Sequence, residues 1–139
     1  MRNRTFAMLG VLALLAASSA FGQQNLRVDI PFEFHFADVV LPAGQYVVDT
    51  EARNIHNLLS FDCDACRVHA VALPHTVGGR DVSSEGRLIF NKYGDTYFLA
   101  EVWVPGRIQG MALSKSKTEH ELARVSLPAR TGQVIVASR

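Results

Sequence analysis

A strict alternation of apolar and polar residues over residues 26–36 constrains the fold of this chain more than any other feature. The apolar members are Leu26, Val28, Ile30, Phe32, Phe34 and Phe36, and the residues between them are Arg27, Asp29, Pro31, Glu33 and His35. Period two is the side-chain repeat of a β-strand that buries one face and exposes the other. Pro31 falls in the polar set and cannot donate to a ladder, which indicates an edge strand or a bulge.

Further strand patterns follow at short spacing. The segment Leu41-Pro42-Ala43-Gly44 predicts a turn, and residues 46–50 predict a second strand. Residues 57–73 predict a hairpin, and residues 87–93 with 96–104 predict another, turned by Gly94-Asp95, a pair suited to a type II′ tip. Residues 133–137 predict a last strand. Residues 74–86, rich in Gly and Ser, predict a mobile surface loop.

Both hairpins allow a register to be argued. With Asp64 and Ala65 at the tip of the first hairpin, or in a four-residue loop of the same register, the facing pairs are Cys63 with Cys66, Asp62 with Arg67, Phe61 with Val68, and Leu59 with Ala70. In the second hairpin, a three-residue loop with a bulge places Leu88, Phe90, Phe98, Ala100 and Val102 on one face. The opposite face then holds Arg87, Ile89, Asn91, Tyr97, Leu99, Glu101 and Trp103, and is apolar enough that another element is expected to cover it.

One short helix is expected near the C-terminus. Thr118 and Glu121 fit a capping box, and Pro128 ends the run. Leu122 and Val125 form its narrow apolar stripe. The pattern as a whole predicts a mainly β protein: a small antiparallel β-sandwich or partly open barrel of about seven strands with this one helix.

Residues 1–22 have the pattern of a secretory signal peptide. Arg2 and Arg4 precede the apolar run 6–17, which as a helix would rise about 18 Å, too short for a hydrocarbon core of about 30 Å. Small residues follow, so cleavage is expected after Gly22, with Ala20 as the neighbouring choice. Removing 22 of the 139 residues leaves 117, which predicts a single β-rich domain over residues 23–139. We expect it in the periplasm or outside the cell.

Charge argues against several partners. Arg2 and Arg4 leave with the signal, so 12 of the 14 basic residues face 13 acidic ones. A nearly neutral chain with scattered basic residues offers no footprint for nucleic acid or anionic lipid. The remainder has no long apolar run, so no membrane span is expected.

Cys63 and Cys66 are the only recognisable chemical motif. An even cysteine count in an oxidising compartment favours a structural disulfide across the hairpin end. A redox role is disfavoured because Asp62 and Asp64 flank the pair and oppose thiolate formation. A metal site is disfavoured because the pair supplies two of the four ligands that structural zinc needs.

Catalytic patterns are missing from the sequence. The five histidines are His35, His56, His69, His75 and His120, and none occurs in an HExxH or His-x-His pattern. No G-x-S-x-G elbow is present. We therefore expect no enzymatic activity, no cofactor and no metal.

The aromatic residues of the second hairpin are the better functional candidates. Tyr93, Tyr97 and Trp103, with Phe90 and Phe98, are either covered by the C-terminal helix or last strand, or they form a ligand or partner surface.

The order of motifs resembles a family of short, exported, uncharacterised proteins of acidobacteria. The resemblance rests on Ile30-Pro31-Phe32-x-Phe34, Leu41-Pro42-Ala43-Gly44-x-Tyr46, Tyr93-Gly94-Asp95-x-Tyr97-Phe98-Leu99, Trp103 and Glu121-Leu122-Ala123. It covers most of the chain after residue 22 and implies no activity or cofactor. The cysteine pair is not part of the family pattern.

Three hypotheses follow. The leading one is a non-enzymatic exported domain that acts through its surface, in envelope structure or by binding a protein partner. The second is a binder of a small apolar ligand, with a pocket between sheet and helix lined by Phe90, Phe98 and Trp103. The third is a redox or metal protein that uses Cys63 and Cys66.

Overall fold

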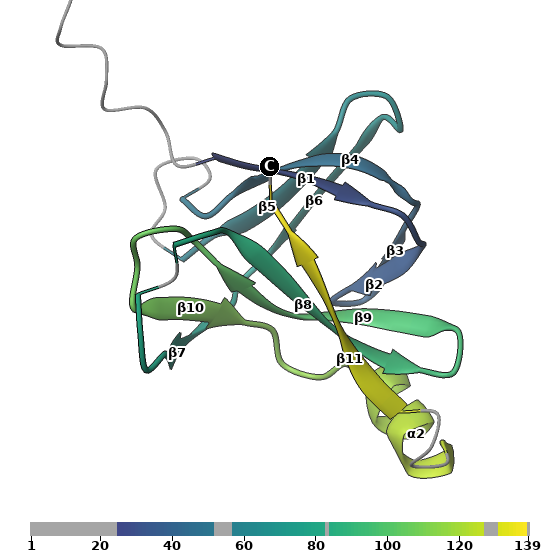
Figure 1. Ribbon diagram of the computed structural model, residues 1–139. Helices are drawn as coiled ribbons and strands as arrows, with labels where there is room; N and C mark the ends of the chain where they lie inside the picture. The colour runs from purple at the N-terminus through teal and green to yellow at the C-terminus, as the bar shows by residue number, and fades with distance from the viewer. Residues whose placement is uncertain (1–24, 52–56, 83, 127–130, 139) are drawn as a thin grey trace, which may run out of the picture.

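Two β-sheets pack face to face in this protein (Figure 1). The computed structural model describes residues 25–51, 57–82, 84–126 and 131–138. The first sheet has the order β1 (Asn25–Ile30), β4 (Gly44–Asp49), β5 (Leu59–Cys63) and β6 (Val68–Ala72). The second has the order β11 (Thr131–Ala137), β8 (Arg87–Tyr93), β9 (Thr96–Trp103), β10 (Gln109–Ala112) and β7 (His75–Gly78). In addition, β2 (Phe34–Phe36) pairs with β9, and β3 (Val39–Leu41) pairs with β2. With the helix α2 (Lys117–Val125), this arrangement confirms the predicted small β-sandwich.

The predicted strand over residues 26–36 is in fact two strands in different sheets. β1 ends at Ile30, and β2 begins at Phe34 and pairs with β3 and β9 of the second sheet. Pro31 lies at the break, where its missing N–H interrupts no ladder. The alternation nevertheless holds on both sides of the break, because both strands turn the same set of side chains into the space between the sheets.

The hairpin of β5 and β6 keeps the predicted faces, but the predicted register was wrong. Cys63 lies opposite Val68 and Asp62 opposite His69, because the turn has four residues, 64–67, with Arg67 at φ 54°. Relative to the predicted register, each residue of β5 therefore pairs two residues further along β6. Because side chains alternate between faces, a shift by an even number of residues leaves every side chain on its predicted face.

In the hairpin of β8 and β9, Gly94-Asp95 forms a two-residue turn, with positive φ at Gly94 (63°). A bulge lies at Ile89/Phe90, in the strands rather than in the loop as predicted. Phe90 therefore lies opposite Leu99, and Asn91 lies opposite Phe98, so the predicted face that joined Phe90 with Phe98 was wrong. A bulge inserts one residue, and one residue reverses the faces beyond it.

Three smaller predictions also need correction. Part of the predicted loop 74–86 is the strand β7, which pairs with β10. The N-cap of α2 is Ser116 and not Thr118: the Ser116 hydroxyl accepts the Glu119 N–H at 3.2 Å. The predicted apolar stripe does not anchor the helix, because Val125 is largely exposed and Glu119 is the buried residue. Pro128 and the signal-like segment 1–22 lie outside the described residues.

An aromatic cluster joins the two sheets at the core. Phe34 is fully buried, and its ring centroid lies 5.5 Å from that of Tyr46, 6.0 Å from that of Phe61 and 5.4 Å from that of Phe90. Tyr46 and Phe61 come from the first sheet and Phe90 from the second. Within the described residues, no helix is long and apolar enough to cross a membrane.

Candidate functional site

The five aromatic residues that were expected either to be covered by another element or to form a ligand or partner surface do not share one face. Phe90 and Tyr97 point into the sandwich, where the Phe32 ring stacks on Tyr97 at 3.9 Å and meets Phe90 edge-on at 5.1 Å. This group belongs to the core.

Tyr93 and Phe98 lie on the opposite face of the same hairpin, beside α2. The Tyr93 hydroxyl donates to Glu119 Oε1 at 3.1 Å, and Asn91 Nδ2 donates to the same oxygen at 2.9 Å. Burial, and then the charge and hydrogen bond of Glu119, raise the pKa of Tyr93 above its ordinary value of 10.0. Glu119 is only 4% exposed, so these polar contacts hold the helix on the sheet.

Trp103 lies at the other end of β9 and is 7% exposed. Its Nε1 donates to Glu101 Oε2 at 2.7 Å, and the Arg87 guanidinium lies 5.4 Å from the ring centroid. The ring covers the backbone of Gly110, and its far edge meets Gly79. Phe90, Phe98 and Trp103 therefore do not line one pocket between sheet and helix.

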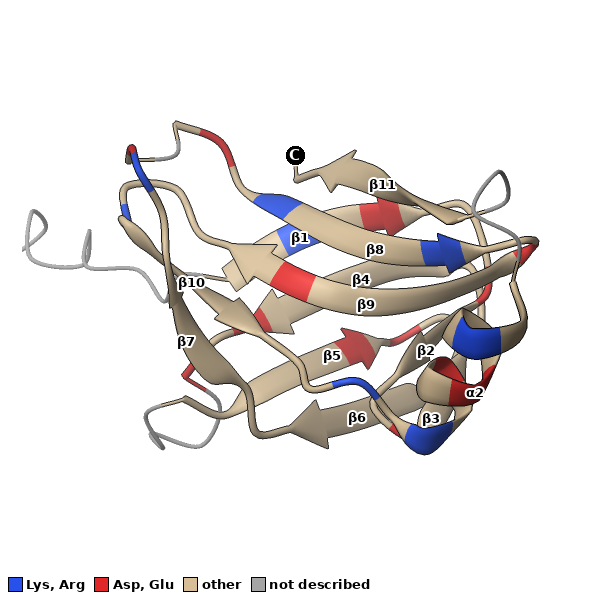
Figure 2. Cartoon of the chain, turned by 90° about the horizontal axis from the view of Figure 1, so that it is seen from below, with Lys and Arg blue, Asp and Glu red and all other residues tan. Residues whose placement is uncertain are grey.

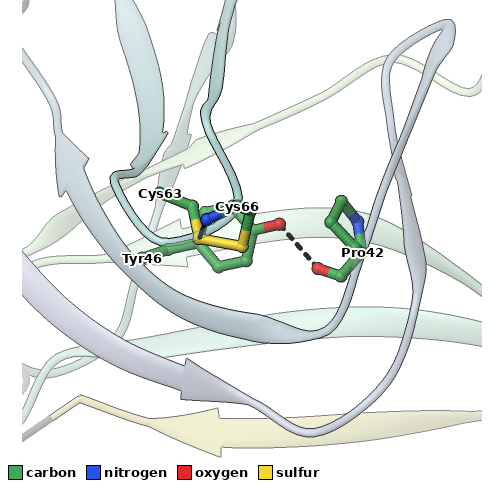
Figure 3. Close-up of a disulfide and its surroundings, with 4 residues drawn as sticks. All are labelled: Pro42, Tyr46, Cys63 and Cys66. Carbon is green, nitrogen blue, oxygen red and sulfur yellow. Dashed lines mark hydrogen bonds between the residues drawn. A yellow bond between two sulfur atoms is a disulfide. The ribbon is translucent and has the colours of Figure 1, made fainter.

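Cys63 and Cys66 form the predicted disulfide, with an S–S distance of 2.03 Å (Figure 3). Cys63 is buried, and the Cys66 N–H donates to Cys63 Sγ at 3.2 Å. A Cβ atom on Gly44 would lie 2.9 Å from Cys66 Sγ, so glycine lets the loop lie against β4. The Tyr46 hydroxyl donates to the Pro42 carbonyl at 2.6 Å and ties the preceding turn to the same region (Figure 3).

A cavity of about 610 Å³ is associated with this disulfide loop. Its lining residues are Arg27, Val28, Asp29, Gln45, Tyr46, Val47, Asp62, Asp64 and Ala65. The register places Arg27, Val47 and Asp62 in one row across β1, β4 and β5, and Asp29 lies beside Gln45. Asp64 and Ala65, the two residues enclosed by the disulfide, complete the lining. We take this cavity as the candidate site.

The sequence alone does not predict this cavity, because strand order brings its residues together. The available signal was the set of polar residues on the exposed faces of residues 26–36 and 57–73. Only the pairing of β4 between β1 and β5 makes these faces adjacent.

One carboxylate of the lining, that of Asp62, is bound to two side chains outside the lining. Asp62 accepts a hydrogen bond from the Ser60 hydroxyl at 3.2 Å through Oδ2 and pairs with His69 through Oδ1. Ser60 and His69 therefore both contact the Asp62 carboxylate. In a catalytic triad the serine hydroxyl is bonded to the imidazole instead, so these three side chains do not have the triad arrangement. Among residues 25–51, 57–82, 84–126 and 131–138, no group of three or more His, Cys, Asp or Glu side chains is arranged to hold a metal ion.

Charges of both signs are interspersed over the strands and the helix (Figure 2).

No family model matches the chain, and neither the curated proteins nor the solved structures contain a significant match.

Proposed function

We propose that the protein is a non-enzymatic exported β-domain that binds a protein partner of the cell envelope through its surface. The observation that carries this proposal is the cavity on the four-stranded sheet, lined in part by the disulfide-closed residues Asp64 and Ala65. Export is supported by the signal-like residues 1–22 and by a disulfide suited to an oxidising compartment.

The disulfide loop is suited to recognition because it is ordered before a partner arrives. The Cys66 N–H donates to Cys63 Sγ, and both sulfur atoms occupy the space that a Cβ at residue 44 would need, so the loop is ordered against β4. A loop fixed in advance loses little conformational entropy on binding. The lining holds three carboxylates and one guanidinium, which favours a partner that presents a basic side chain beside hydrogen-bonding groups.

A small-molecule ligand is the second candidate function. The cavity volume of about 610 Å³ falls within the range of small-ligand sites, roughly 300–1,000 Å³. This candidate uses the outer cavity and not the pocket predicted beside the helix.

The test is site-specific photo-crosslinking in the exporting cell. A photoreactive residue at Ala65 should give a defined protein adduct, and the same residue at exposed Ile135 on β11 should not. The reversal Asp64→Lys should remove the Ala65 adduct while the protein remains folded and exported. Equal adducts from both positions, or none from Ala65, would refute the proposal.

Native mass spectrometry of gently purified protein separates the two candidates. The expected mass is that of a chain that starts near Gln23, less two hydrogen atoms for the disulfide. Extra mass that is lost on denaturation, together with no protein adduct at Ala65, would favour the small ligand.

A further inference from the structure

In the part of the chain that the structure describes, the four-stranded sheet is open at its β6 edge. Among the described strands, β6 pairs only with β5, whereas the opposite edge strand β1 lies against β11 of the second sheet. In Figure 2, β6 is the lowest strand of its sheet. A strand edge presents unpaired N–H and C=O groups that another strand can join.

This edge lacks the features that usually protect such strands. β6 contains no charged residue, no proline and no bulge, and the whole stretch 68–78 is free of Asp, Glu, Lys and Arg. Its outward side chains include Val71, which is 45% exposed, and Leu73, just beyond the strand, is 77% exposed. Exposed, uncharged, apolar edges are where natural proteins pair with further strands.

The other open edges are poorer candidates. β3 has only three residues. β7 has four and runs into Gly79 and the charged residues Arg80 and Asp81. β6 has five residues and is followed by the exposed Leu73, so the apolar exposure continues one residue beyond the strand and ends at the buried Pro74.

We propose that β6 pairs in antiparallel fashion with β6 of a second copy of this chain, which makes a two-fold symmetric dimer with one continuous eight-stranded sheet. A two-fold axis at Val71 places this residue opposite its own counterpart, and His69 opposite Leu73 of the second copy. This register keeps each residue on its present face and covers the two exposed apolar side chains.

Charge favours a second copy as the occupant. Antiparallel pairing of an uncharged strand with itself sets no like charges opposite each other. After residues 1–22 are removed, 12 basic residues face 13 acidic ones, so long-range repulsion between copies is small. This interface is separate from the proposed contact of Asp64 and Ala65 with a partner, so either proposal can fail while the other stands.

Sedimentation velocity from micromolar to near-millimolar concentration tests the dimer. Val71→Lys and Val71→Glu each place like charges opposite each other on the axis, and each should weaken dimerisation at least about tenfold. Mixing the two variants should restore a heterodimer, because lysine then lies opposite glutamate. Ile135→Lys on β11, at a site that is 63% exposed, is the matched control and should leave the dimer intact.

Circular dichroism should show native folding for all the variants, since both sites are exposed in the monomer. A wild-type protein that is monomeric throughout the concentration range would overturn the proposal. A dimer that survives both Val71 substitutions, or variants that stay monomeric when mixed, would also overturn it.

Discussion

Gly110→Ala is expected to destabilise the protein because the Trp103 ring occupies the position of the new methyl group. A Cβ atom at residue 110 would lie 2.8 Å from Trp103 Cδ2 and Cε2 and 2.9 Å from Cε3. Carbon atoms in contact prefer about 3.5–4.0 Å, so the ring or the strand would have to move by roughly 1 Å.

The ring has little freedom to make this movement. Its Nε1 is bonded to Glu101, the Arg87 guanidinium lies over it, and a Cβ on Gly79 would be only 2.8 Å from Cζ3. Overpacking of a well-filled site costs about 1–3 kcal/mol. We therefore expect Gly110→Ala to lower the free energy of unfolding by about that amount.

Gly132→Ala is the matched control. Gly132 also lies in a strand, but a Cβ there has no atom within 4 Å and its φ is not in the left-handed region. Reduced entropy of the unfolded chain should raise the stability of this variant by about 0.4–1 kcal/mol. The two glycine substitutions are therefore expected to change the free energy of unfolding in opposite directions.

Urea unfolding followed by circular dichroism, and by fluorescence of Trp103, the chain's one tryptophan, measures both effects. In a Trp103→Leu background the Gly110→Ala penalty should disappear, because the ring atoms that would clash with the methyl group are gone. The reasoning is refuted if Gly110→Ala is as stable as wild type, or if its penalty persists after the ring is removed.

Three further predictions concern the core, the disulfide and the buried tyrosines. Phe34→Ala should cost about 3–5 kcal/mol in urea unfolding, because it empties the centre of the aromatic cluster, and a loss below 1 kcal/mol would contradict that central position. Replacing Cys63 and Cys66 together by Ala should cost only about 2 kcal/mol, because the closed loop spans four residues, and reductant should then no longer change the melting temperature. Burial raises the pKa of both Tyr46 and Tyr93 above 10.0, so the folded state resists their ionisation; stability should be unaffected below pH 10 and fall as the pH rises above it. Phenolate absorbance should show both groups ionising late, and in the double Phe variant the alkaline loss of stability should be shallower; an unchanged pH profile would contradict the assignment.

Local patterns predicted much of the fold. The alternation over residues 26–36 identified the buried set Leu26, Val28, Ile30, Phe34 and Phe36. The Gly94-Asp95 turn and the Cys63–Cys66 disulfide were also predicted correctly, because each depends on residues close in sequence. The register of the first hairpin was wrong by an even number of residues, so its faces were still correct.

The wrong predictions concern features in which a displacement of one or two residues changes the position of a side chain. The bulge at Ile89/Phe90 reversed the predicted faces of Tyr97, Phe98 and Leu99, whereas Val102 and Trp103 kept theirs. Phe90 and Phe98, which were expected on one face, therefore lie on opposite faces of the hairpin. Nothing in the local pattern shows where a bulge occurs, because its position is set by packing against the strands on either side. The N-cap of α2 is Ser116 rather than Thr118, and Glu119 in the first turn of this helix accepts hydrogen bonds from Asn91 and Tyr93, which are distant in sequence.

The sequence by itself determined that this chain forms strands, which side chains those strands bury and where the cysteine pair closes a loop. These outcomes follow from side-chain period and turn chemistry, which act over a few residues. Only the tertiary structure decided that Pro31 divides one strand between two sheets, that Arg27 and Asp62 lie across β4 from each other, and that β6 has an open edge. Strand order is set by the packing of residues far apart in the chain, and no local pattern contains it.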